Sequence, residues 1–293
     1  MTNARLLILG SSGQVGQQIK QVALENPRME TIDLARSNHG AYAFDLSNPS
    51  ATEDLVATIR PRHTILAAAA TNVAWCETHI NESWATNVTG TTAVARACER
   101  VGSTLTFLST DYVFDGSLAP SAEDDPTNPL NAYGRQKLAA EEAIVATCRE
   151  ALVIRTCQVF GPDRRRANFV LRVVDQLRAG VPVQAPTNLY GTPTYALDLA
   201  RDVMALTLEG QGGIWHVAGE SFVSRYELAY AAATAFGIEA APIQRTLANE
   251  VSDGVTRPLR SGLSCERLIA ANRYAPTPLE AALSHLADTE SAA

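Results

Sequence analysis

Short β-rich runs alternate with helical stretches through the first half of this chain. Five apolar runs are typical of buried strands, namely residues 5–10, 29–34, 63–69, 104–109 and 151–156. Between the first two, apolar residues recur at the spacing of one helical face, at Val15, Ile19, Val22 and Ala23. Strands and helices in strict alternation require parallel pairing with right-handed crossovers. The sequence therefore predicts an α/β fold built on a doubly wound parallel sheet.

A glycine-rich turn follows the first predicted strand and opens the first predicted helix. It reads Gly10-Ser-Ser-Gly13-Gln-Val-Gly16, one residue longer than the common dinucleotide fingerprint. Glycines at such a place allow a tight turn and a close approach of phosphate to the backbone. The helix N-terminus adds free N–H groups and the positive end of its dipole. The turn therefore predicts a dinucleotide site.

Charged residues lie at the end of the second predicted strand and just after it, where the adenosine of a dinucleotide would lie. Asp33 can accept hydrogen bonds from the ribose hydroxyls, whereas Arg36 would favour a 2′-phosphate. Both are present, so the choice between NAD and NADP stays open. Asp45, in the stretch FDLSNP, is a candidate for the adenine amino group; an N-cap or a plain loop acid is the alternative.

After about Gly161 the alternation loosens, which indicates a second, smaller region. Helical patterns near 166–178, 196–208, 225–236 and 264–271 are separated by turn-rich loops, and a strand-like run returns at 214–219. We assign 1–161, with returning segments near 187–218, to a dinucleotide-binding domain. The smaller region comprises 162–186 and 219–287, and residues 288–293 are expected to form a frayed tail.

Composition argues against several classes of function. The net charge of -7 gives no basic surface for nucleic acid or anionic lipid. The longest apolar run, near residues 65–70, is too short to span a bilayer, and residues 6–9 are too short for a secretory signal. We therefore expect a cytoplasmic protein without nucleic-acid or membrane partners. The five cysteines form no CxxC pair and the five histidines have no ligand spacing, so we expect reduced thiols and no metal site.

Tyr133 and Lys137 stand four residues apart at the start of a predicted helix, and therefore on one helical face. A free tyrosine, with a pKa of about 10, is a poor acid–base catalyst at neutral pH. A neighbouring ammonium stabilises the phenolate and lowers that pKa, and it can also bridge the nicotinamide ribose hydroxyls. Ser109 and Thr110 end the fourth predicted strand, at the edge where open α/β sheets bind ligands. Thr110 can donate to a substrate carbonyl alongside Tyr133.

These motifs resemble, in order along nearly the whole chain, the extended short-chain dehydrogenase/reductase superfamily and within it the dTDP-4-dehydrorhamnose reductase-like family. The matching stretches are GSSGQVG (10–16), FDLSNP (44–49), STDYVFDG (109–116), DDPTNPLNAYGRQKLAAEE (124–142), VIRTCQVFG (153–161), ANF (167–169), YGTPTYALDLA (190–200), WHVAG (215–219) and RPLRSGLSCERL (257–268). The resemblance implies a Rossmann-type doubly wound parallel sheet with a smaller interleaved α/β substrate-binding region. It also implies catalytic Thr110, Tyr133 and Lys137, with NADPH or NADH as cofactor.

The implied reaction transfers hydride from the nicotinamide to C4 of a nucleotide-linked 4-keto-6-deoxyhexose, a step of deoxysugar biosynthesis. Tyr133 would deliver the proton to the oxygen. Superfamily members often pair through helices, so a homodimer is the default expectation. The expected cofactor-binding residues are Gly10, Ser12, Gly13, Gln14, Val15, Gly16, Asp33, Arg36, Asp45, Leu46, Ala67, Ala68, Ala69, Asn87, Tyr133 and Lys137. The expected substrate-binding residues are Thr71, Val73, Thr110, Asp111, Tyr133, Gln158, Asn168 and Arg257.

The chain departs from the family pattern where sugar or nucleotide would be held. Cys157-Gln158 replaces Ser-Trp, Thr187-Asn188 replaces Asp-Gln, and Val73-Ala74 replaces Val-Asp. The identity of the sugar is therefore open. Three consecutive arginines at 164–166 could clamp a diphosphate, but we interpret them as a solvated loop with charges at a helix start.

Two other functions stay open. A 4-epimerase needs the same threonine, tyrosine and lysine but keeps its cofactor through a cycle of oxidation and re-reduction. The regulatory subunit of methionine adenosyltransferase resembles the same subfamily and binds a dinucleotide without turnover. A dehydratase is disfavoured because Asp111 is followed by Tyr112, where elimination chemistry wants a second acid.

Overall fold

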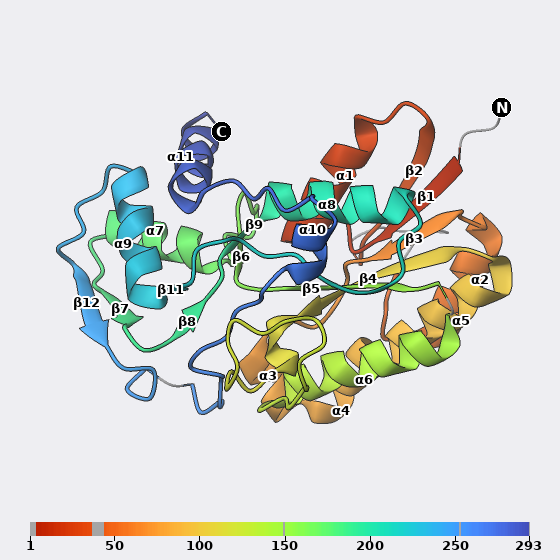
Figure 1. The fold of residues 1–293 in the computed structure, drawn as a ribbon, viewed down its shortest axis with the longest axis horizontal. Helices are drawn as coiled ribbons and strands as arrows, with labels where there is room; N and C mark the ends of the chain where they lie inside the picture. Colours follow the sequence, from red (N-terminus) through yellow and green to blue (C-terminus); the bar gives the residue numbers. More distant parts are fainter. Residues whose placement is uncertain (1–3, 37–43, 149, 252, 293) are drawn as a thin grey trace.

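The computed structural model of the protein describes residues 4–36, 44–148, 150–251 and 253–292. Within these ranges a parallel sheet of six strands forms the centre of the molecule (Figure 1), in the order β10-β5-β4-β3-β1-β2. Its strands are β1 (Ala4–Leu9), β2 (Met29–Leu34), β3 (His63–Leu66), β4 (Thr104–Thr110), β5 (Leu152–Thr156) and β10 (Gly213–His216). The predicted α/β fold with a doubly wound sheet is confirmed.

Helices cover both faces of this sheet (Figure 1). One face carries α1 (Gln14–Leu24) and α8 (Ala196–Leu208); the other carries α2 (Pro49–Ile59), α5 (Thr91–Val101) and α6 (Ala132–Thr147). Successive strand residues point to opposite faces. Accordingly Leu6 and Ile8 pack with α1 and α8, while Leu7 and Leu9 pack with α2, α5 and α6. All four side chains are fully buried, and the sequence of β1 is accordingly a continuous apolar run, as is typical of a strand covered on both faces.

The order of the strands creates a crevice between β1 and β3. From β1 the chain crosses through α1 to β2 at the sheet edge, then returns through α2 to β3 on the other side of β1. The helices that follow β1 and β3 therefore lie on opposite faces, and the loops at the carboxyl ends of these strands diverge. Ligands of open α/β sheets bind at such a switch point.

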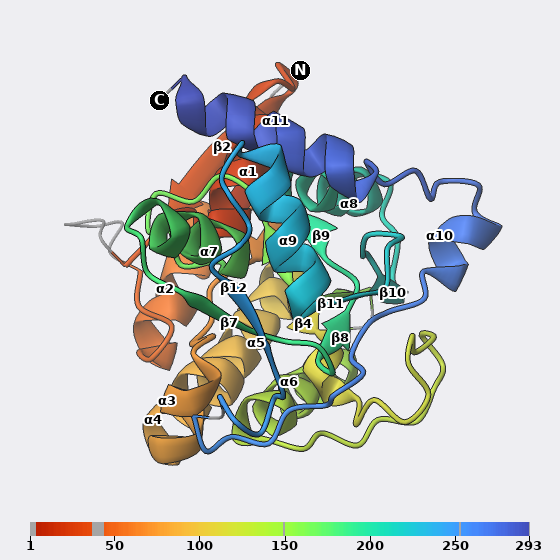
Figure 2. The same ribbon diagram turned by 90° about the vertical axis from the view of Figure 1, so that its left-hand side faces the viewer.

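A smaller region lies beside the sheet, on the left of Figure 1. In it, α7 (Phe169–Arg178) and α9 (Arg225–Ala235) pack together and α11 (Leu279–Ser291) contacts α9 (Figure 2). Here β7 (Val183–Pro186) pairs in parallel with β12 (Ile243–Thr246). The remaining elements are short, namely β6 (Val159–Phe160), β8 (Tyr190–Gly191), β9 (Thr194–Tyr195), β11 (Val223–Ser224) and α10 (Glu266–Ala270). The chain returns to the large sheet at β10, and the domain boundaries given above stay a prediction.

The C-terminal segment differs from its expected frayed tail. Helix α11 continues through residues 288–291, and Ala293 lies outside the described residues. Leu286 is fully buried on one face of this helix, and Glu290 forms an ion pair with Arg166. The small polar composition of the segment gave no sign of that partner, which lies far away in the sequence.

The helical stretch over residues 80–101 is interrupted. It divides into α4 (Ile80–Trp84), a π-helical turn (Ala85–Gly90) and α5. Gly90 lies so close to the carbonyl oxygen of Leu46 that any Cβ would collide with it. The wider turn therefore accommodates a close backbone approach, as π-turns at functional sites often do.

The five cysteines are buried free thiols. In the described part of the chain, each helix is too short or too polar to cross a bilayer.

A buried ion pair joins α6 to the sheet. The Arg155 guanidinium on β5 lies 2.7 Å from a carboxylate oxygen of Glu141 on α6, and each side chain is only 3% exposed. Ser109, on β4, donates a hydrogen bond to the same carboxylate. A buried charge needs such a full set of partners to balance its lost hydration. Glu141 therefore holds α6 against β4 and β5 together.

We expect Arg155→Met to lower the free energy of unfolding by about 3 kcal/mol or more, because it leaves the Glu141 charge buried without a cation. Urea denaturation monitored by far-UV circular dichroism measures this loss. The double variant Arg155→Met with Glu141→Leu, which removes both charges, should recover most of it. A single variant as stable as the wild type would contradict this account.

Candidate active site

The glycine-rich turn forms an open cradle at the start of α1. Gly10 has φ +100°, and its N–H donates to the Leu34 carbonyl oxygen at 2.7 Å. A Cβ on Gly10 would lie 2.5 Å from the Ala68 nitrogen, and a Cβ on Gly16 would collide with the Gly10 carbonyl oxygen. Gly13 is different, because the atom nearest to a Cβ placed there would lie 3.4 Å away, which is an ordinary contact distance. It caps α1 without any side-chain hydrogen bond, so the helix N-terminus stays accessible to an anionic ligand.

The loop after β3 forms the other wall of this crevice and is held by Asn87. The Asn87 Oδ1 accepts from the Ala70 nitrogen at 2.8 Å, and its Nδ2 donates to the Ala70 carbonyl oxygen at 3.0 Å. The same Nδ2 donates to Gln136 Oε1 at 2.9 Å. Asn87 is 1% exposed, so it fixes the backbone beside the predicted cofactor residues Ala67, Ala68 and Ala69.

Both signs of charge meet at the carboxyl end of β2. Asp33 forms an ion pair with Lys20 of α1 at 2.9 Å, a partner that the sequence analysis did not identify. Asp45 accepts hydrogen bonds from Ser47, which lower the pKa of the Asp45 carboxyl. Asp45 therefore forms a local turn, and Asn48 is the residue that caps α2. The described part ends at Arg36 on this side, so the geometry leaves the preference between NAD and NADP open.

Thr110 and Tyr133 meet where β4 ends and α6 begins. The Thr110 hydroxyl donates to Asp111 Oδ1 at 3.0 Å, and it lies near enough to the Tyr133 phenol to lower the pKa of that phenol. Helix α6 starts at an Asn131 cap whose Oδ1 accepts from the Gly134 nitrogen at 2.9 Å. A Cβ on Gly134 would collide with the carbonyl oxygen of Tyr112, in the turn that follows β4. Helix α6 therefore approaches this turn closely. The phenol is thereby placed at the ligand-binding edge of the sheet.

Lys137 lies one turn further along α6 and is 2% exposed. Its ammonium donates to the Leu108 carbonyl oxygen at 2.7 Å and lies 3.8 Å above the Phe107 ring. Burial lowers the pKa of Lys137 to about 7, against the opposing effect of Glu141.

The pKa of Tyr133 moves the opposite way from the sequence-based prediction. Burial raises it, the Asp111 carboxylate raises it further, and the hydrogen bond from Thr110 only partly offsets them. The expectation that Lys137 brings this pKa down was wrong for the structure described, because the Lys137 ammonium is directed at Leu108 instead. Tyr133 is therefore a neutral phenol at neutral pH.

A buried polar group extends from this pair toward the smaller region. Asp111 is 4% exposed, accepts from Cys157 Sγ at 3.1 Å, and has its pKa raised by burial. Gln158 follows with φ +45° and packs its amide against Gly191. Arg225, at the start of α9, stacks 4.6 Å over the Phe169 ring and acts electrostatically on Asp111. No sequence signal pointed to Arg225, because only the fold brings α9 to this place.

Two of the predicted substrate residues are occupied by contacts within the protein. Asn168 caps α7, since its Oδ1 accepts from the Leu171 nitrogen at 3.0 Å, and its Nδ2 donates to the Gly161 carbonyl oxygen at 3.1 Å. Arg257 makes two hydrogen bonds to Asp253, at 2.6 and 2.7 Å, and lies near Tyr112. Thr71 is exposed, and Val73 begins the short helix α3 (Val73–Thr78).

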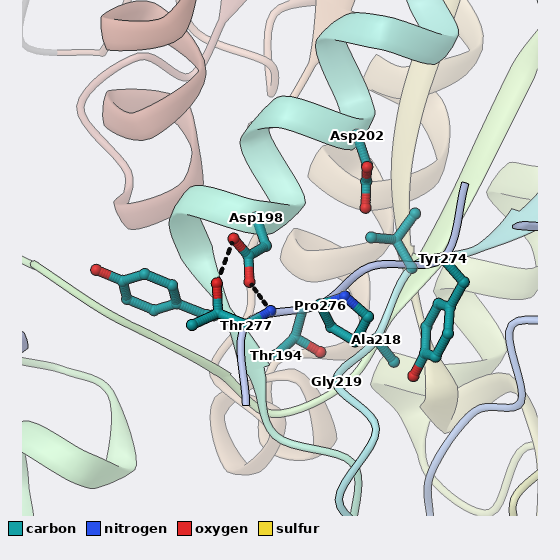
Figure 3. Close-up of a pocket in the computed structure, with 10 residues that line it drawn as sticks. Thr194, Asp198, Asp202, Ala218, Gly219, Tyr274, Pro276 and Thr277 are labelled. Atoms are coloured by element: carbon teal, nitrogen blue, oxygen red, sulfur yellow. Dashed lines mark hydrogen bonds between the residues drawn. The ribbon is translucent and has the colours of Figure 1, made fainter. Parts of the chain in front are cut away.

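A small cavity elsewhere has a structural role. It lies between the start of α8 and the segment before α11, where Asp198 accepts from the Thr277 nitrogen at 2.8 Å and from its hydroxyl at 3.0 Å (Figure 3). At about 10 Å³ it has room for one water molecule at most. Within the described ranges, moreover, no cluster of three histidine, cysteine, aspartate or glutamate side chains could hold a metal ion.

Known proteins match this arrangement along its length. The model of the RmlD substrate binding domain matches residues 4–291. The dTDP-4-dehydrorhamnose reductase of Mycobacterium tuberculosis is 37% identical over 232 residues, which cover 76% of this chain and 72% of that protein. The dTDP-4-keto-6-deoxy-D-glucose reductase of Streptomyces niveus is 30% identical over 258 residues, or 87% and 86% of the two chains. A crystal structure of dTDP-4-dehydrorhamnose reductase from Bacillus anthracis in complex with NADP superimposes with a TM-score of 0.90 at 25% identity, over 97% of this chain and 98% of that one.

The state of Lys137 can be measured directly, because the sequence contains only two lysines, Lys20 and Lys137. In protein labelled with ¹³C-lysine, we expect one side-chain Cε signal to titrate near pH 7. The variant Lys20→Gln removes the other signal and so assigns this one to Lys137. A Lys137 signal that stays constant between pH 6 and pH 9 would show that burial does not lower its pKa as described.

Proposed function

The chain belongs to the RmlD substrate binding domain family, and on that premise we propose that it reduces the 4-keto group of a nucleotide-linked 4-keto-6-deoxyhexose with NADPH or NADH, in deoxysugar biosynthesis. The observation that carries the proposal is that Thr110, at the end of β4, and Tyr133, in the first turn of α6, lie together at the carboxyl edge of the sheet beside the buried Asp111 carboxyl. The relatives are named as reductases of such sugars, and one homologous structure holds NADP.

The crevice fits a dinucleotide. Gly10 and Gly16 are positions where a side chain could not be placed, and Gly13 leaves the first turn of α1 open to phosphate. When bound, the nicotinamide supplies the hydride for the reduction. Lys137 and Tyr133 are the residues proposed to hold the nicotinamide ribose, and Asp33 with Arg36 the adenosine end.

The chemistry of the protein is then proton delivery to the keto oxygen. Reduction of a ketone needs a proton donor, and the raised pKa of Tyr133 keeps its phenol protonated until the substrate is present. Thr110, by turning its one hydroxyl proton from Asp111 to the same oxygen, donates a second hydrogen bond as negative charge develops there. The Lys137 ammonium lies one helical turn away and donates to the Leu108 carbonyl oxygen, so it must turn from Leu108 to stabilise the phenolate formed on Tyr133.

The sugar side of the cleft is proposed to be formed by Thr71, Val73, Asp111, Gln158, Asn168 and Arg257. Asp111 and Gln158 have the best support, because Asp111 accepts hydrogen bonds from the Thr110 hydroxyl and the Cys157 thiol, and Gln158 follows Cys157 with its amide against Gly191. Arg225 is added to this set. Its guanidinium lies on Phe169, close to Asp111, and has no ion-pair partner in the described part of the chain.

We expect purified protein to oxidise NADPH or NADH stoichiometrically with an enzymatically prepared dTDP-4-keto-6-deoxyglucose pool that includes its epimerised forms. Absorbance of the reduced nicotinamide follows the reaction. Tyr133→Phe, which keeps the ring and removes the proton donor, should lower kcat by about 100-fold or more while leaving cofactor binding intact. Bound cofactor without net oxidation would instead favour the 4-epimerase or the non-catalytic dinucleotide-binding subunit.

The effect of Asp111 on Tyr133 gives a pH test. Asp111→Asn removes a charge that raises the pKa of Tyr133, so the phenol should deprotonate at lower pH. Since the protonated phenol is the active acid, the alkaline limb of the kcat profile should move to lower pH. The control is Asp54→Asn, on the exposed surface of α2, which should leave the profile in place. An alkaline limb that moves upward would refute the assignment of Tyr133 as the acid.

A further inference from the structure

The three consecutive arginines at 164–166 do not behave as one solvated group. Arg166 adopts φ +50° and pairs with Asp175 at 2.7 Å and with Glu290, which fixes it to α7 and α11. Arg164 and Arg165 are both exposed. Arg165 reaches the other region of the molecule, because its guanidinium lies 3.6 Å from the position that a Cβ on Gly13 would occupy.

The loop that carries Arg165 is held in one conformation by Asp163, which is 5% exposed. One Asp163 carboxylate oxygen accepts from the Arg165 nitrogen at 3.1 Å, and the other accepts from the Ala167 nitrogen at 2.9 Å. The Asp163 carbonyl oxygen accepts from the Arg166 nitrogen at 2.8 Å. Gln14, in the first turn of α1, donates to the Gly161 carbonyl oxygen at 3.3 Å. The start of the loop is thus attached to the start of α1.

Two positive groups face each other across Gly13. The N-terminus of α1 carries the positive end of the helix dipole and has no side-chain cap. In the described residues, the Arg165 guanidinium has no carboxylate partner within ion-pair distance. Like charges held together repel unless an anion lies between them. A group with two or more negative oxygens would accept from the backbone N–H groups on one side and from the guanidinium on the other.

We propose that Arg165 binds the pyrophosphate of the dinucleotide from the side opposite α1. The inference rests on the cofactor assigned under the proposed function. It adds a residue from the smaller region to a site otherwise formed by the large sheet. Cofactor binding then connects the two regions through Gly13 on one side and Arg165 on the other.

The test compares cofactor binding by neighbouring arginine variants with no sugar present. Isothermal titration gives the Kd of NADPH and of NADH for wild type, Arg165→Gln and Arg164→Gln. Loss of a charged hydrogen bond to phosphate corresponds to a rise in Kd of about tenfold or more. We expect this rise for Arg165→Gln with both cofactors, because both contain the pyrophosphate, and no comparable change for Arg164→Gln. Arg165→Lys should recover part of the affinity.

If Arg165 instead stabilised the fold, its substitution would lower the Tm of the cofactor-free protein. Because Arg165 is exposed and unpaired in the described structure, Arg165→Gln should keep the Tm of the cofactor-free protein. Arg166→Gln, which breaks two ion pairs, should lower it. Equal affinities for Arg165→Gln and Arg164→Gln would overturn the proposal. A loss confined to NADPH would also overturn it, by placing Arg165 at the 2′-phosphate.

These outcomes are independent of the reductase assay. If Arg165→Gln weakens both cofactors while the wild type reduces no keto sugar, the inference stands and the proposed reaction fails. If the wild type reduces the sugar and Arg165→Gln binds both cofactors as tightly as wild type, the reaction stands and the inference fails.

Discussion

The buried carboxylate of Glu141 is the contact on which the catalytic geometry depends. It accepts from Arg155 on β5 and from Ser109 on β4, and it lies one turn after Lys137 on α6. The residue after Ser109 is Thr110, so one carboxylate fixes both the strand that presents the threonine and the helix that presents Tyr133. A shift of α6 by one turn would move the phenol by about 5.4 Å along the helix axis, beyond hydrogen-bond reach of Thr110.

The sequence predicted the parts of the site that are local in the chain. Gly10 and Gly16 are constrained by a turn that they themselves form, and the spacing of Tyr133 and Lys137 follows from the period of a helix. Asn87 shows where this reasoning stops. Its partners Ala70 and Gln136 are 17 and 49 residues away, and it lies on the π-helical turn between α4 and α5. Such contacts depend on how separate elements pack, which a single sequence does not display.

The protonation of Tyr133 likewise depends on packing that the sequence does not display. Their common helix face was predictable, but the direction of the Lys137 ammonium is set by the Leu108 carbonyl and the Phe107 ring on β4. With that ammonium directed at Leu108, burial and Asp111 dominate, and Tyr133 stays protonated. A protonated phenol is the productive form for reduction and the unproductive one for oxidation. The protonated Tyr133 phenol can therefore supply the proton that reduction of a keto group needs.

The proposed cofactor side and the proposed sugar side of the site are built on different strands. The cofactor side depends on β1 and the turn after it, whereas Cys157 and Gln158 follow β5 and face the smaller region. Asp111 accepts a hydrogen bond from the Cys157 thiol, and a serine hydroxyl at that position could donate to the same oxygen. Exchange of residues 157 and 158 can therefore alter the contacts to a sugar while the Thr110–Tyr133 contact stays in place. The departures from the family pattern at residues 157 and 158 therefore leave Thr110 and Tyr133 in place.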